Sequence, residues 1–351
     1  METIRERSGI YHRLSPYRDG LTAIGLSFLV FLQLLQRYLN ITNGGSEWSW
    51  DVRVIWAQLA AYVADGVPLY VLPAVDNKPP LWKLITVGLM NNFPRGILLV
   101  AVAVANVALV LGVFTLGKRR YGYWTASFIS LLLVGALPSA AGLEYQPHNF
   151  AAALIVFGVI ASGSFATGMS LGAASMFVQY GGLALPALLL KVHRENGLGR
   201  ESLVRFWTGF ASVLIPSFLA VTAIWGWESL RGALYWTFVA PVGYVLGRSS
   251  AEPPYSGQST QYSPIHNPVY WGDLVLDFVL RNAFIVLPAV GVGALIAIRR
   301  NSDTEIVDVV AVGCLLTPLL VRGLPHYWLF PLPFMCLLTG RFLVSFSTND
   351  Y

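Results

Sequence analysis

The sequence predicts an all-α, polytopic membrane protein with about ten transmembrane helices. Hydrophobic residues make up 55% of the 351 residues and charged residues only 12%, whereas a soluble globular domain has roughly 25% charged residues. The mean hydropathy is +0.60. The net charge of +5 comes from short basic clusters between apolar runs, an arrangement typical of the cytoplasmic side of membrane proteins. This distribution of the basic residues argues against nucleic acid as a partner.

The apolar segments alternate with short polar loops, and the basic clusters give the direction of each crossing. A helix needs about 20 apolar residues to cross ~30 Å of hydrocarbon. The predicted spans cover residues 21–39, 97–116, 124–141, 150–162, 169–178, 183–190, 203–225, 274–298, 306–321 and 328–344. Since Lys and Arg are enriched in cytoplasmic loops, we expect residues 1–20 and the C-terminus in the cytoplasm. The protein is then integral to the cell membrane.

We expect one domain over residues 1–351, without a soluble module, an internal repeat or a cleavable signal peptide. Cys314 and Cys336 both lie in apolar segments. They are typical of small hydrophobic core residues, because neither has a partner spacing that suggests a disulfide or a metal site.

Two long external loops are predicted, residues 40–95 and 226–273. In the first, residues 52–64 place Val54, Trp56 and Leu59 on one face of an interfacial helix, which Gly66 and Pro68 end. Residues 81–93 are apolar but too short to span. They predict a second interfacial or re-entrant helix, although a continuous helix with the following span is an alternative.

Ionisable residues are costly at membrane depth, so those at the ends of spans are functional candidates. Three predicted external turns supply such residues. The candidates are Asp51, Arg53, Asp76 and Lys78 in the first loop, Glu144 and His148 in the second turn, and Arg322, His326 and Tyr327 in the last. Because all three turns are predicted on the same side of the membrane, we expect them to form one site.

Each candidate also has a structural interpretation. Asp51 is either a general base for an acceptor hydroxyl or an acid that stabilises the start of a helix. Lys78, held extended by two following prolines, either binds a phosphate or anchors the loop at the interface. Interfacial anchoring is the alternative for Arg322 and His326, and a solvated turn is the alternative for Glu144 and His148. A metal site from Asp51, Glu144 and His148 has no spacing signature.

Several motifs resemble a known family. The acid after the first span, the segment Gly66-x-Pro68-x-Tyr70 and the motif Asn77-Lys78-Pro79-Pro80-Leu81 are similar to the first external loop of the GT-C superfamily. The likeness is to the branch of dolichyl-phosphate-mannose protein mannosyltransferases and lipid A aminoarabinose transferases. The glycine-rich run 168–174 resembles its middle span, and the run 326–333 resembles its late segment.

The resemblance implies a GT-C-like membrane glycosyltransferase that uses a polyprenyl-phosphate-linked sugar on the extracytoplasmic face. The acceptor is a protein, a glycan or a lipid. Asp51 matches the catalytic acid, Lys78 the lysine near the lipid-linked phosphate, and His326 and Tyr327 the late turn near the donor. The sequence departs from the family pattern at Val52, where a second acid is common, and at Gln179-Tyr180, where a lysine is usual.

The expected reaction is a single displacement with inversion, in which Asp51 takes the acceptor proton and cationic residues offset the charge of the leaving phosphate. It requires no cofactor and no metal ion, although a divalent cation is possible. Two alternatives remain. One is a transporter or flippase for a lipid-linked or small polar solute, and the other is a catalytically silent assembly partner with the same scaffold.

Overall fold

The computed structural model describes residues 2–71, 78–240, 267–299, 305–321 and 323–347, with side chains from residue 17 onward except at 297, 299, 321 and 347. All secondary structure in these ranges is helical, without a strand. The expectation of an all-α protein is therefore confirmed for the described chain. The expected interfacial residue Asp76, the residue Arg322 and most of the second external loop lie outside these ranges.

Three described helices are long and apolar enough to cross a membrane. They are Tyr17–Thr42 within α1 (Glu2–Thr42), α4 (Ile97–Tyr121), and Arg200–Val239, which comprises α9 (Arg200–Leu234) and η3 (Tyr235–Val239). A fourth candidate is the bent pair α12 (Pro268–Arg281) and α13 (Ala283–Arg299). Shorter apolar helices are α5 (Tyr123–Ala136), α6 (Pro147–Ile160), Ile306–Leu320 and Leu332–Phe346. The count of about ten spans stays a prediction.

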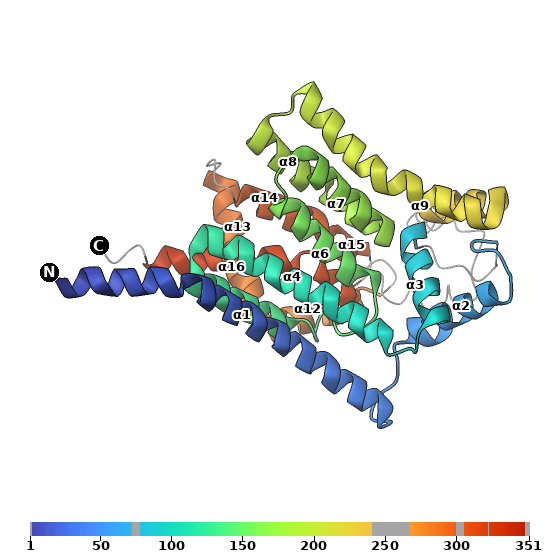
Figure 1. The fold of residues 1–351 in the computed structure, drawn as a ribbon, viewed down its shortest axis with the longest axis horizontal. Coiled ribbons are helices and arrows are strands. Elements are labelled where there is room, and N and C mark those ends of the chain that lie inside the picture. Colours follow the sequence, from blue (N-terminus) through green and yellow to red (C-terminus); the bar gives the residue numbers. More distant parts are fainter. Residues whose placement is uncertain (1, 72–77, 241–266, 300–304, 322, 348–351) are drawn as a thin grey trace.

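Helix α4 lies in the middle of the bundle, between α1 on one side and α6 and α16 (Leu332–Ser347) on the other (Figure 1). Over half of its apolar window is buried in the protein, 56%, against 17% for α1 and 22% for the α9 segment. The outer helices instead expose large apolar side chains, such as Phe28, Phe31 and Ile224. Exposed apolar surface of this extent is typical of a membrane-facing protein.

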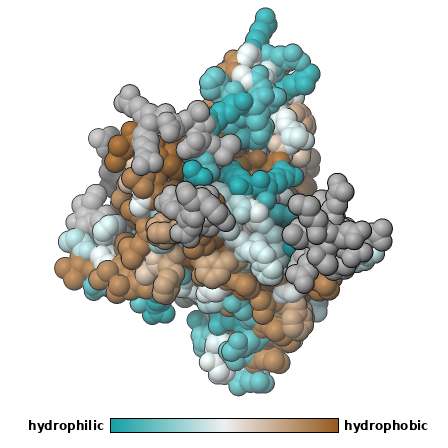
Figure 2. Space-filling model, turned by 90° about the vertical axis from the view of Figure 1, so that its left-hand side faces the viewer, coloured by the Kyte–Doolittle hydropathy of each residue, from teal (hydrophilic) through white to brown (hydrophobic). Residues whose placement is uncertain are grey.

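The basic clusters gather at one end of the bundle. Lys118 near the end of α4 pairs with Asp19 of α1, and Arg120 pairs with the buried Asp308 of α14 (Ile306–Leu315). The N-terminal end of α1 and the C-terminal end of α16 lie at this same end (Figure 1). Seen from there, hydrophilic residues gather in the middle of the face and hydrophobic residues at its sides (Figure 2). This arrangement agrees with one basic side of a membrane protein.

Lys191 directly follows the predicted span 183–190 and lies buried in α8 (Leu185–Asn196). Its ammonium group donates to the carbonyl of Ala161 and to Thr167 Oγ1, and it pairs with Glu195. These partners offset the cost of removing the charge from water. Lys191 thereby joins α8 to the start of α7 (Ser164–Phe177), which begins five residues before the predicted span 169–178.

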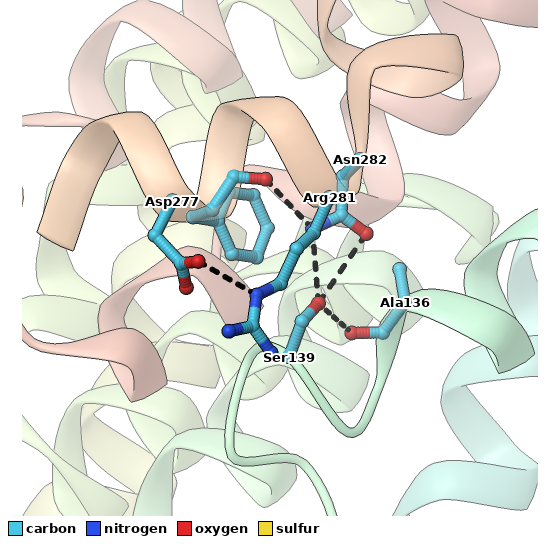
Figure 3. A network of polar contacts seen from close by, with 6 residues as sticks. Ala136, Ser139, Asp277, Arg281 and Asn282 are labelled. Carbon is cyan, nitrogen blue, oxygen red and sulfur yellow. Dashed lines mark hydrogen bonds and ion pairs between the residues drawn. The ribbon is translucent and has the colours of Figure 1, made fainter. Parts of the chain in front are cut away.

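The predicted span 274–298 is wrong as a single helix, because α12 and α13 meet at an angle of 96°. Asn282 stands at the break. Its Nδ2 donates to the carbonyl of Phe278 over 2.9 Å and to Ser139 Oγ over 2.9 Å. Ser139 in turn donates to the carbonyl of Ala136 over 2.7 Å (Figure 3). The amide of Asn282 thus satisfies backbone and side-chain groups at the break, which the apolar composition did not indicate.

Other boundaries also shift. The span predicted at 124–141 ends at Ala136, because Pro138 has no N–H to bond the carbonyl of Val134. That carbonyl accepts from Gln33 Nε2 of α1 over 3.1 Å instead. The segment predicted at 306–321 divides into α14 and α15 (Thr317–Val321), and the helix predicted from residue 328 is η5 (Pro325–Leu329) followed by α16.

The predicted helices of the first loop are confirmed. A π-helical turn, η1 (Asp51–Trp56), continues into α2 (Ala57–Ala64), whose chain turns at Gly66 with a φ of 82°. The second helix, α3 (Pro80–Asn92), is separate from α4 because Pro94 interrupts the chain between them. Both helices lie at the end of the molecule opposite the chain termini (Figure 1).

Helices α7 and α9 pack with their backbones in contact, because glycines face each other. A Cβ added at Gly168 would overlap the carbonyl of Phe206, and one added at Gly209 would overlap the carbonyl of Phe165. Small residues allow this kind of approach between membrane helices, where van der Waals contact drives association.

We therefore expect Gly168→Ala to destabilise the protein by about 1–3 kcal/mol or more, since the added methyl group meets backbone that cannot move aside. The measurement is the thermal unfolding midpoint of the purified protein in detergent. Gly313→Ala is the matched control, because a Cβ at this helical glycine has no neighbour within 4 Å. Equal midpoints for the two variants would contradict the close α7–α9 contact.

Candidate functional site

Three segments that are far apart in the sequence meet at the end of the bundle opposite the basic clusters. Asp51 of the first loop contacts Gln146 in the turn between α5 and α6. His148, two residues later, stacks against His326 of η5. The sequence predicted that these segments share one side, and the contacts bring them together into one candidate site.

Buried amides hold the turn between α5 and α6. Asn106 Nδ2 of α4 donates to the carbonyl of Gly142 over 2.7 Å. Asn149 Nδ2 donates to the same carbonyl over 2.6 Å and to Asn106 Oδ1 over 3.0 Å. Both asparagines are fully buried, and buried amides with partners of this kind fix a loop in one conformation. The turn therefore presents Gln146 and His148 on a rigid support.

The acidic part of the site contains Asp51 and Glu144. Asp51 is half-buried, and its Oδ2 accepts a hydrogen bond of 2.7 Å from Gln146 Nε2. Burial raises the pKa of the Glu144 carboxyl; the positive charge of Arg37 opposes this change and the negative charge of Asp51 adds to it. Two carboxyl groups thus lie in one partly desolvated region, an arrangement that can keep one of them protonated.

The imidazole part of the site centres on His148, which is 2% exposed. Its ring lies 4.3 Å from that of His326 and 5.3 Å from that of Tyr327, centroid to centroid. Neither ring nitrogen has a hydrogen-bond partner among the described residues. Burial lowers the pKa of His148, and the charges of His326 and Lys78 lower it further. His148 is therefore neutral at pH 7, beside a lysine.

Lys78 is positioned through its backbone. Tyr70 Oη donates to the carbonyl of Lys78 over 2.7 Å, and Tyr70 itself has a φ of 71°, in the left-handed region. The buried ammonium group of Lys83 lies 3.9 Å from the centroid of the Tyr70 ring, a cation–π geometry that stabilises a desolvated charge. Pro79 is extended, with a ψ of 163°. The sequence predicted this extended, proline-held segment.

An aromatic cluster packs among the segments that carry the site residues. The Trp82 ring stacks on Tyr145 at 4.6 Å and lies edge-on to Trp56 at 5.7 Å. Phe150 and Phe177 complete the cluster, and Tyr145 Oη is 3.0 Å from Thr86 Oγ1. Contacts of this kind contribute beyond the area that they bury. They attach η1, α3, α6 and α7 to one another close in sequence to Asp51 and His148.

Not every predicted site residue joins this group. Arg53 pairs with Glu47, and both side chains are largely exposed, so Arg53 is engaged on the outer side of η1. Asp76 and Arg322 lie outside the described residues. The described residues contain no group of three His, Cys, Asp or Glu side chains that could hold a metal ion, which removes the support for a site from Asp51, Glu144 and His148.

Four site residues were not predicted as such: Gln146, Tyr70, Lys83 and Tyr180, whose ring lies 5.3 Å from that of Tyr327. Gln146 precedes Pro147 at the start of α6, but no local pattern indicates that it faces Asp51. Lys83 occurs in an otherwise apolar helix. A lysine in that setting is the one signal that sequence reasoning had for these residues.

Chemically, the site offers a carboxylate oriented by an amide, a second carboxyl group, and an imidazole pair next to a lysine. Two cavities of the described chain lie away from these residues, one between α1 and α4 and one along α9. Comparison with protein-family models, curated proteins and solved structures gives no match to this chain.

The raised pKa of Glu144 leads to a prediction about stability. In the folded state, the Glu144 carboxyl keeps its proton to a pH above its ordinary pKa of 4.5. The free energy of unfolding therefore falls as the pH rises through the raised pKa. Glu144→Gln removes that loss. We expect the variant's unfolding midpoint, minus that of the wild type, to increase between about pH 4 and about pH 8.

The measurement is thermal unfolding in detergent across this pH range. Glu201→Gln is the control, because Glu201 is exposed and pairs with Arg205 in the first turn of α9. A difference between Glu144→Gln and the wild type that stays constant with pH would contradict the burial effect.

Proposed function

We propose that this protein is an integral membrane glycosyltransferase that moves a sugar from a polyprenyl-phosphate-linked donor to an acceptor hydroxyl on the extracytoplasmic face. The observation that carries the proposal is the convergence of Asp51 with Gln146, and of Lys78 with His148 and His326. These residues come from three loops at the end opposite the basic clusters. In the proposed topology the short apolar helices also cross, which gives a GT-C-like scaffold of about ten spans.

In the proposed reaction Asp51 acts as the general base. The hydrogen bond from Gln146 Nε2 orients the carboxylate of Asp51, and in the proposed reaction this carboxylate accepts the proton of the acceptor hydroxyl. The acceptor oxygen attacks the anomeric carbon from the face opposite the donor phosphate, and the bond between that carbon and the phosphate oxygen breaks. The polyprenyl phosphate leaves with the electron pair, so one displacement inverts the configuration.

The leaving phosphate needs positive charge rather than a proton. Lys78 supplies the positive charge, and the imidazoles beside it, the neutral His148 and His326, supply hydrogen-bond donors. Donors held in place before the reaction stabilise developing charge without reorganisation. We assign the donor phosphate to this side of the site and the acceptor to the side of Asp51, with Tyr327 between the imidazoles and Tyr180.

One observation favours a second candidate function, a transporter or flippase for a lipid-linked or polar solute. The pair α12 and α13 is bent by 96° at the polar residue Asn282. Transporters commonly bind their substrates at discontinuous helices. A transporter does not need Asp51 as a base, so a test of that residue separates the two functions.

We expect Asp51→Asn to lower the rate of sugar transfer by about two orders of magnitude or more, the usual effect of losing a general base. The measurement is transfer of labelled sugar from polyprenyl-phosphate-linked donors to endogenous acceptors in membranes, with wild type and variant at equal expression. Asparagine keeps the size of the side chain and its contact with Gln146.

Glu201→Gln serves as the control, since this exposed acid lies in the first turn of α9, away from the site residues. Equal transfer by wild type and Asp51→Asn would contradict the role of Asp51. Absence of transfer with every donor, together with uptake or flipping of a lipid-linked substrate into vesicles, would support the transporter instead.

A further inference from the structure

A second site lies at the basic end of the bundle, away from the residues of the candidate functional site. A cavity of about 480 Å³ opens between α1 and α4. Its lining consists of Asp19, Gly20, Ala23, Leu111, Phe114, Thr115, Lys118 and Arg119. Both walls are helices that are long and apolar enough to cross a membrane, so we expect the cavity to open toward the lipid bilayer.

The lining is polar at one end and apolar at the other. Along α4, Leu111 and Phe114 precede Lys118 and Arg119, so the cavity changes from hydrocarbon to cationic within two helical turns. On α1 the residues opposite are small, and a Cβ added at Gly20 has no neighbour within 4 Å. The open volume is therefore a consequence of glycine and alanine on α1 beside larger side chains on α4.

Positive charge exceeds negative charge at the mouth. Lys118 pairs with Asp19, whereas the exposed guanidinium of Arg119 has no ion pair or hydrogen bond with another described residue. Arg18, the residue before Asp19, is not part of the lining, and its guanidinium is stacked 3.8 Å from the centroid of the Tyr123 ring of α5. Arg119 is thus the guanidinium of the lining that has donors to spare beside an apolar slot.

We propose that this cavity binds an anionic glycerophospholipid. Its phosphate group would contact Arg119 and Lys118, and one acyl chain would lie along Ala23, Leu111 and Phe114. Guanidinium groups suit phosphate oxygens because they donate parallel hydrogen bonds, and basic pockets between membrane helices on the cytoplasmic side bind anionic headgroups in this way. The apolar half of the lining favours a lipid over free phosphate.

The test uses the full chain purified in detergent. Dioleoyl phosphatidylglycerol is titrated against dioleoyl phosphatidylcholine, and bound lipid is counted by native mass spectrometry. We expect phosphatidylglycerol to bind about tenfold more tightly, because its headgroup has a net negative charge, whereas the choline cation of phosphatidylcholine offsets the phosphate and is repelled by Lys118 and Arg119. Arg119→Gln should lower the affinity for phosphatidylglycerol by about tenfold, and Arg95→Gln, which removes an equal charge at an exposed position of the other end, should leave it unchanged.

Filling the cavity gives a second, independent variant. Gly20→Leu should abolish binding because the new side chain occupies the space of the acyl chain, while Gly25→Leu, at another open glycine of α1 that does not line the cavity, should not. Equal binding of the two lipids, or unchanged binding in both Arg119→Gln and Gly20→Leu, would overturn the proposal. Displacement of the phospholipid by millimolar inorganic phosphate would also overturn it, since the site would then be one for a free anion.

Discussion

The turn between α5 and α6 depends on amide side chains that satisfy backbone groups away from water. Pro138 leaves the carbonyl of Val134 without its helical donor, and Gln33 supplies one from α1. The carbonyl of Gly142 accepts from Asn106 and Asn149 together. In an apolar surrounding, unsatisfied backbone groups are so costly that such bonds decide where a chain can leave a helix. The positions of Gln146 and His148 follow from them.

Buried ionisable side chains have different partners at the two ends of the bundle. At the basic end, the buried Asp308 is paired with Arg120, and Lys191 binds a carbonyl, a hydroxyl group and a carboxylate. At the other end, His148 is buried without a hydrogen bond to a described residue, and Glu144 lies near a second acid. The first arrangement fixes helices in place. The second leaves polar groups at the site in an environment that changes their protonation.

The packing of the outer helices explains why two kinds of surface coexist. Glycines on α7 and α9 allow these helices to approach so closely that an added Cβ at Gly168 or Gly209 would overlap backbone of the other helix. Glycine and alanine on α1 have the opposite effect, because a Cβ added at Gly20 meets no atom within 4 Å and these small residues line a cavity between α1 and α4. The same small residues therefore produce close contact or a cavity, according to the distance between the helices.

The sequence alone determined the helical class, the apolar helices, the two helices of the first loop and the proline-held segment at Lys78. These features depend on local composition, on helical spacing and on proline, all of which act over a few residues. It also predicted that Asp51, Glu144, His148 and His326 share one side, because basic clusters give the direction of each crossing.

Only the tertiary structure decided which of these residues touch. The contact of Asp51 with Gln146, the stacking of His148 on His326 and the bend at Asn282 join residues 95, 178 and 143 positions apart, respectively. No local pattern records such pairs, since each results from the way whole helices pack. The buried position of Lys191 has the same origin: its partners Ala161 and Thr167 come from other segments, which a count of basic residues in loops does not include.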